Sequence, residues 1–271
     1  MSSGVLLIVL FAALLHASWN ALIKAGPDKM RDSVLISAFA SLISAAILPF
    51  LVLPDAASWP FILASATIHV AYYSLVGLAY RQGDMSYAYP LMRGLPPLLV
   101  ALVSGPLIGD SLPVWAWAGI LCLCGGVLSL VSLRRAPAKA ALLNVLAIAG
   151  YTIIDGIGVR RSGAPLSYTL WIFLLGAIPL VIWASRRGGF WAYARHRRWH
   201  GLAGGAGTLS AYALILWAMT KAPVAEVAAL RETAILFGTA ISALFLKEQI
   251  GWNRAVAAGM VTLGAILLRL A

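Results

Sequence analysis

The sequence predicts an all-α integral membrane protein in which ten transmembrane helices form two inverted five-helix repeats around a central cavity. Three observations lead to this prediction. The composition is strongly apolar, the apolar residues fall into ten runs of helix length, and the charged residues follow a matched pattern in the two halves of the chain.

The composition excludes a soluble fold. Hydrophobic residues make up 62% of the 271 residues, and charged residues make up only 11%. Soluble domains contain about 45–50% apolar residues and about 25% charged residues. The 20 basic and nine acidic side chains are therefore too few to cover the surface of a soluble protein of this length.

Ten apolar runs divide the chain, and each has about the length that crosses a bilayer as a helix. Their continuous apolar character differs from the alternating pattern of membrane β-barrel strands. The first run lacks a preceding basic segment, so we interpret it as a helix of the mature protein and not as a secretory signal peptide. The predicted helices cover 5–23, 33–53, 60–80, 86–107, 112–132, 140–159, 166–184, 201–220, 224–246 and 252–270.

The basic residues predict the orientation, because short loops rich in Lys and Arg stay in the cytoplasm. The loops after the first, third, fifth, seventh and ninth runs hold most of these residues, namely Lys24, Lys29, Arg31, Arg81, Arg134, Arg135, Lys139, Arg186, Arg187, Arg195, Arg197, Arg198 and Lys247. Both termini are therefore expected on the non-cytoplasmic side of a bacterial cytoplasmic (inner) membrane. We expect the Arg-rich stretch 186–198 to contact anionic lipid, and we expect no nucleic-acid partner.

A repeated spacing of charges predicts an internal duplication. Arg93 precedes Asp110 by 17 residues, and Arg231 precedes Glu248 by the same 17 residues. A glycine follows 16 residues after each of the two acidic positions.

The chain thus divides into two five-helix halves, 1–135 and 136–271. Because five is an odd number, the second half is inserted upside down relative to the first. Inverted repeats are common in secondary transporters, where the substrate site lies near the midplane between the halves.

The segment HASWNALIK at residues 16–24, the two Arg segments with their following acidic residues, and the Gly-rich closing helices resemble the EamA-type permeases of the drug/metabolite transporter superfamily. The resemblance covers essentially the whole chain, although Asp110 stands where the family pattern more often has Glu. It implies a carrier for small organic solutes in the cytoplasmic membrane, often an exporter and usually without ATP.

Ionisable side chains inside the runs are candidate functional groups, because a charge near the bilayer centre costs several kcal/mol unless it has a partner or faces water. Arg93 and Arg231 approach the midplane from opposite faces, and either could hold a substrate carboxylate or phosphonate. Alternatively they are structural, Arg231 with Glu232 or Asp155 and Arg93 with exposed helix-end carbonyls. The prolines and glycine around Arg93 interrupt its helix, which fits either a cavity lining or a packing kink.

Aromatic and polar side chains recur at helical spacing near these charges, and they complete the predicted site. We expect substrate to contact His16, Trp19, Asn20, His69, Tyr72, Tyr73, Tyr89, Arg93, Tyr151, Asp155, Tyr212 and Arg231. The candidate proton-coupling groups are His16, Asp155 and Glu232. The mid-span aromatic residues either face a cavity that suits an amphipathic solute or pack only against neighbouring helices.

The predicted function is secondary active export of small organic metabolites, such as amino acids or related zwitterions and anions, by alternating access with protons as a candidate coupling ion. We expect no cofactor and no metal, since the sequence has no P-loop, HExxH, CxxC or GxSxG pattern. The expected partners are a small organic solute and the lipid bilayer, with the chain acting as a monomer or a weak homodimer. The alternatives are a membrane-embedded enzyme that uses His16, His69 and Asp155 on a lipid-linked substrate and, third, a sensor or partner subunit that transports nothing.

Overall fold

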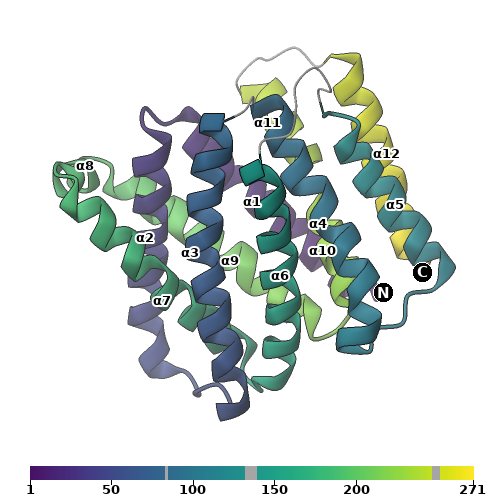
Figure 1. Ribbon diagram of the computed structural model, residues 1–271, viewed down its shortest axis with the longest axis horizontal. Coiled ribbons are helices and arrows are strands. Elements are labelled where there is room, and N and C mark those ends of the chain that lie inside the picture. Colours follow the sequence, from purple (N-terminus) through teal and green to yellow (C-terminus); the bar gives the residue numbers. More distant parts are fainter. Residues whose placement is uncertain (83–84, 132–138, 246–250) are drawn as a thin grey trace.

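The computed structural model describes residues 1–82, 85–131, 139–245 and 251–271, and these ranges form a bundle of helices without a strand (Figure 1). In chain order the helices are α1 (Ser3–Ala25), α2 (Lys29–Ile47), α3 (Trp59–Gln82), α4 (Met85–Ile108), α5 (Val114–Leu128), α6 (Lys139–Arg161), α7 (Pro165–Arg186), α8 (Phe190–His196), α9 (Arg198–Met219), α10 (Val224–Arg231), α11 (Ala234–Phe245) and α12 (Trp252–Leu270). Two short 3₁₀ turns, Leu48–Phe50 and Ala56–Ser58, lie between α2 and α3.

Eight helices in the described part of the chain are long and apolar enough to cross a membrane: α1, α2, α3, α4, α6, α7, α9 and α12. The multi-pass membrane architecture is therefore confirmed. Helix α5 is apolar but has only 15 residues. The number of ten crossings remains a prediction.

The predicted helix 224–246 was wrong as a single element, because the structure divides it into α10 and α11. At the break, the amides of Glu232, Thr233 and Ile235 each bond to the carbonyl three residues earlier. This tighter turn replaces the α-helical pattern and brings the Glu232 carboxylate to Arg93 on α4.

Side-chain caps mark the starts of α1 and α2. The Ser2 hydroxyl accepts a hydrogen bond from the amide of Val5, and the Asp28 carboxylate accepts one from the amide of Arg31. Such caps satisfy amides that have no partner within the helix. Before α8, Gly188 and Gly189 have φ values of 73° and 68°, a left-handed conformation that glycine adopts at little cost.

Glycine allows α5 and α12 to pack closely. A Cβ atom added at Gly119 would lie 2.9 Å from the carbonyl oxygen of Gly264, and one added at Gly264 would lie 2.7 Å from that of Gly119. Small residues at helix crossings in membranes permit this approach. The two termini lie at the same end of the bundle, where Arg269 donates to the carbonyl of Met1 and to the hydroxyl of Ser3 (Figure 1).

The end of the bundle that holds the termini is closed by apolar packing. The starts of α1, α3, α7 and α10 and the end of α9 meet there, and each contributes a side chain that is at most 6% exposed to the largest apolar cluster. These side chains are Val5, Ile62, Tyr168, Val224 and Met219. The central cavity therefore lies between this apolar plug and the opposite end of the bundle.

Candidate functional site

A central cavity encloses about 830 Å³ of empty space, part of which is open to the outside, and residues of eight helices line it. Nine of the twelve predicted substrate residues contribute to this lining: His16, Trp19, His69, Tyr72, Tyr73, Arg93, Tyr151, Tyr212 and Arg231. Ionisable and aromatic groups that are far apart in sequence thus come together around one cavity.

Three predicted residues do not line the cavity. The Asn20 side chain donates to the carbonyl of His16 at 2.7 Å, which turns its amide back toward its own helix. Tyr89 also lies outside the lining. Asp155 is fully buried behind Tyr212, whose ring does reach the cavity.

Two guanidinium groups share one carboxylate at the wall formed by α4 and α10. Arg93 Nε lies 2.9 Å from one carboxylate oxygen of Glu232, and Arg231 Nε lies 3.9 Å from the other. The side chains of Arg93, Arg231 and Glu232 are only 13%, 7% and 3% exposed. Arg93 is therefore paired with a carboxylate and not with helix-end carbonyls, and this group of three carries a net positive charge.

Two residues of the cavity lining, Arg231 on α10 and Trp19 on α1, carry hydrogen-bond donors without acceptors. Arg231 Nε and Trp19 Nε1 are both buried and have no hydrogen-bond partner. A buried donor left unsatisfied costs about 1–3 kcal/mol, and more when the group is charged. Since both residues line the cavity, a bound molecule that brought an acceptor oxygen to either donor would remove that cost.

Aromatic rings form another part of the cavity wall. His69 stacks on Tyr151 with ring centroids 4.3 Å apart, and Tyr212 lies edge-on to His69 at 5.7 Å. His69 Nδ1 is 2.9 Å from the carbonyl of Ser65, so Nδ1 carries the proton in this arrangement and Nε2 is left as an acceptor. Aromatic faces attract cations, so this wall suits an ammonium group.

Asp155 links the aromatic wall to the apolar plug. Its carboxylate accepts a hydrogen bond from the hydroxyl of Tyr212 and another, at 3.1 Å, from the hydroxyl of Tyr168 on α7. Tyr212 reaches the cavity, whereas Tyr168 is fully buried. Tyr168 was not predicted as a site residue, because its only signal in the sequence is a lone tyrosine at the start of a predicted helix.

Asp110 connects the loop between α4 and α5 to α6 and α10 near the termini. Its carboxylate accepts from Arg160 at 2.8 Å and from the amide of Val224, the first residue of α10, at 2.7 Å. Arg160 also donates to the carbonyls of Met219 and Ala222 at 2.8 and 2.9 Å. Asp110 therefore fixes the beginning of the helix that carries Arg231, whereas Glu248, its predicted counterpart, lies outside the described residues.

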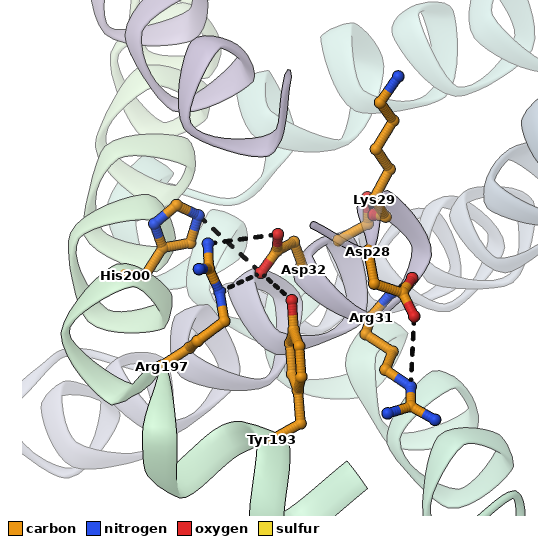
Figure 2. A network of polar contacts seen from close by, with 8 residues as sticks. Asp28, Lys29, Arg31, Asp32, Tyr193, Arg197 and His200 are labelled. Carbon is orange, nitrogen blue, oxygen red and sulfur yellow. Dashed lines mark hydrogen bonds and ion pairs between the residues drawn. The ribbon is translucent and has the colours of Figure 1, made fainter. Parts of the chain in front are cut away.

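A second polar network surrounds Asp32 at the opposite end of the bundle (Figure 2). The Asp32 carboxylate is fully buried and accepts from Arg197 Nε at 2.9 Å and from the hydroxyl of Tyr193 at 2.8 Å. Partial burial and the hydrogen bond to Asp32 raise the pKa of Tyr193 to about 12, so this hydroxyl remains a donor at neutral pH. This network, which ties α2 to α8 and α9, was not anticipated from the sequence.

The described residues contain no cluster of three or more His, Cys, Asp or Glu side chains that could hold a metal ion. The cavity instead combines guanidinium, indole and aromatic groups, which bind small organic molecules by hydrogen bonding, charge and stacking.

Comparisons with known proteins agree with this description. Residues 137–270 match the family described as "EamA-like transporter family". A solved structure described only as "Crystal structure of protein" has the same fold, with a TM-score of 0.73 over 100% of this chain and 98% of that chain at 20% identity. A search of curated proteins found no match.

Proposed function

Starting from the membership of this chain in the EamA-like transporter family of the drug/metabolite transporter superfamily, we propose that it is a secondary active transporter that exports small zwitterionic or anionic metabolites, such as amino acids, by alternating access. Members of this family are membrane transporters and not enzymes. The observation that carries the finer proposal is the pair of unsatisfied donors, Arg231 Nε and Trp19 Nε1, at the wall of a central cavity.

The charges of the cavity favour a substrate with a carboxylate or a related anionic group. Arg93 and Arg231 together contribute two positive charges, and Glu232 neutralises only one. A substrate carboxylate at Arg231 would accept from its unsatisfied Nε and would balance the remaining charge, and the unsatisfied Trp19 Nε1 offers a further donor in the same cavity. Hydrogen bonds between charged groups are shorter and stronger than those between neutral groups, so this contact would orient the substrate.

The aromatic wall favours an ammonium group at the other end of the substrate. His69, Tyr151 and Tyr212 present ring surfaces to the cavity, and Tyr212 connects them to Asp155. A small zwitterion could thus place its carboxylate near Arg231 and its ammonium group near Tyr212. This arrangement supports an amino acid more than a purely cationic drug.

Asp155 is the proposed proton carrier. Its carboxylate is reached from the cavity through Tyr212, whereas the Glu232 carboxylate is already engaged by Arg93. If a substrate ammonium and a proton compete for the negative charge of Asp155, one leaves as the other binds, which yields antiport. The remaining candidate, His16, does line the cavity, unlike Asp155 and Glu232, but it has no carboxylate to offer a substrate ammonium.

The proton role can be tested with Asp155→Asn in vesicles that carry a pH gradient. We expect uptake that depends on the gradient in the wild type and uptake without such dependence in Asp155→Asn. Glu226→Gln, which neutralises a buried carboxyl outside the cavity lining, is the matched control and should keep the dependence. Unchanged coupling in Asp155→Asn would remove Asp155 from the mechanism.

Matched helix contacts support the two inverted repeats, 1–135 and 136–271, a plan that many alternating-access transporters share. Gly119 meets the backbone of Gly264, and Gly126 meets the backbone of Ala257, so the two contacts exchange when each residue is shifted by 138 positions. Arg93 and Arg231 are separated by the same 138 positions. Likewise α3 packs on α6 as α1 packs on α9, which are the corresponding pairs of the two halves.

The basic loop residues and the apolar plug together indicate from which side of the membrane a substrate reaches the cavity. The described basic segments between α1 and α2 and between α7 and α9 lie at the end opposite to the termini, so we place that end in the cytoplasm and both termini outside, in a bacterial inner membrane. Ser37, Leu180 and Thr208 extend the cavity lining toward this end, whereas the apolar plug closes the other. An exporter would load its substrate from the cytoplasm in this conformation.

Ligand binding to the purified full chain tests the substrate class. Thermal-shift measurements against amino acids, small carboxylates, phosphonates and cationic drugs should show stabilisation by zwitterions or anions. Arg231→Gln should weaken that binding about 10- to 150-fold, because a hydrogen bond to a charged group contributes about 1.5–3 kcal/mol.

Arg161→Gln removes an equal charge from an exposed position outside the cavity, so it should leave the affinity unchanged. Equal affinity in the wild type and Arg231→Gln, or stabilisation by cationic drugs alone, would contradict the proposed substrate class.

A further inference from the structure

The segment between α7 and α9, residues 186–200, turns at the end of the bundle that also holds the start of α2, and we call it the elbow (Figure 1). It contains the short helix α8 and five arginines, and it has no acidic residue. The elbow joins the ends of two helices that can each cross a membrane, so it must lie at the bilayer surface.

One face of the elbow is fixed to the protein. Phe190 is 2% exposed and packs with Val34 and Leu35 of α2. Tyr193 and Arg197 point toward Asp32, as Figure 2 shows, and donate to its carboxylate. This inner face accounts for only one of the five arginines.

The other face of the elbow is exposed and both aromatic and basic. Trp191 and Trp199 are 65% and 70% exposed, and together with Arg195, His196 and Arg198 they line a shallow groove. The guanidinium of Arg198 lies 5.7 Å from the ring centre of Trp199. Within the described part of the chain, Arg195 and Arg198 make no ion pair with a carboxylate.

We propose that the groove lined by Trp191, Arg195, Arg198 and Trp199 binds the headgroup of an anionic phospholipid, and that the bound lipid holds the elbow against Asp32 of α2. Exposed tryptophan rings prefer the interface between headgroups and acyl chains, and guanidinium groups bind phosphate oxygens through paired N–H donors. A groove that combines both groups at the ends of two spanning helices fits a lipid better than a soluble anion. The groove and the contacts to Asp32 lie on opposite faces of one short segment. A lipid that fixes the groove should therefore also stabilise the contacts to Asp32.

Native mass spectrometry of the full chain in detergent tests the binding without any transport substrate. Short-chain phosphatidylglycerol should remain bound at concentrations at which phosphatidylcholine of the same chain length does not. Arg195→Gln together with Arg198→Gln should weaken the binding of phosphatidylglycerol about thirtyfold, which corresponds to about 1 kcal/mol for each arginine near an anionic lipid surface.

Two matched double variants sharpen this test. Arg195→Lys/Arg198→Lys keeps the charge and should retain most of the affinity. Arg161→Gln/Lys221→Gln removes two exposed charges at the other end of the bundle and should change nothing. Equal binding of the two lipids, an unchanged affinity in the double Gln variant, or displacement of the lipid by equimolar inorganic phosphate would overturn the proposed lipid site.

The coupling between lipid binding and the contacts of the elbow to α2 can be measured separately. Asp32→Asn leaves the groove intact but removes the charge that holds the inner face of the elbow, so it should weaken phosphatidylglycerol binding several-fold by reciprocal linkage. Tyr193→Phe deletes one hydroxyl on the same face and should act in the same direction with a smaller effect. Unchanged lipid affinity in both variants would refute the coupling between lipid and α2.

Discussion

The carboxylate of Glu232 is expected to stabilise the bundle, because its negative charge offsets the repulsion between the buried guanidinium groups of Arg93 and Arg231. Glu232→Gln keeps the size of the side chain and removes its charge. Arg93 and Arg231, 2.9 and 3.9 Å from the present carboxylate oxygens, would then form an unneutralised pair of cations that are at most 13% exposed. Removing one partner of a buried ion pair costs about 3–5 kcal/mol, and since Gln can still accept a hydrogen bond, we expect the lower end of this range.

The loss can be measured as the free energy of unfolding in detergent micelles or as a thermal midpoint. A destabilisation of about 3 kcal/mol corresponds to a decrease of about 6–12 °C in the midpoint for a chain of this size. Asp28→Asn is the matched control, because it removes the charge from an exposed pair with Arg31 while Asn still caps α2. Exposed pairs contribute about 0–1 kcal/mol, so the control should stay close to the wild type.

A double variant separates charge balance from simple loss of contacts. Arg93→Gln/Glu232→Gln restores the net charge of the group, so it should be less destabilised than the sum of the two single variants, by about 1–3 kcal/mol. A Glu232→Gln protein that is as stable as the Asp28→Asn control, or a double variant with fully additive effects, would refute this reasoning.

Two further predictions concern the packing of the bundle. Gly264→Ala places a methyl group 2.7 Å from the backbone of α5 and should destabilise the fold by about 1–3 kcal/mol, whereas Gly259→Ala on the same helix meets nothing within 4 Å and should be neutral or stabilising. Equal unfolding midpoints for these two variants would show that α5 and α12 do not pack so closely. Arg160→Gln removes the donors that hold Asp110 and two backbone carbonyls before α10, so we expect a loss of about 2 kcal/mol and faster hydrogen exchange at the start of α10. Arg160→Lys should not restore the exchange protection, because a single ammonium cannot match the three directions of the guanidinium contacts, and full protection in that variant would contradict this assignment.

Much of the architecture was predictable because the bilayer imposes simple requirements on sequence. Apolar runs of helix length indicated the membrane-spanning helices, and the comparisons confirmed the resemblance to the EamA-type family. The few ionisable residues inside the runs were also informative. A charge that faces lipid is costly, so Arg93, Arg231 and His16 gather around the internal cavity together with polar aromatic residues.

Other features depend on contacts that no local pattern encodes. The break between α10 and α11 could not be read from hydropathy, because both sides of the turn at Glu232 are apolar and the residue that pairs with Glu232, Arg93, lies on another helix. Helix α8 has seven residues, which is too short for a hydropathy window to separate from a loop. Asp32 and Tyr168 were missed for a related reason, since their partners lie on other helices and their roles appear only when the bundle is assembled.

Counterflow in proteoliposomes tests the central claim most directly. Vesicles that contain the purified full chain are loaded with an unlabelled ligand from the thermal-shift screen and diluted into a trace of the labelled compound. We expect saturable accumulation of the chemically unchanged label, a loss of at least tenfold in Arg231→Gln, and wild-type exchange in Arg161→Gln. Formation of a product without flux, or exchange that is indifferent to Arg231→Gln, would contradict the assignment of this cavity as the substrate site of a secondary transporter.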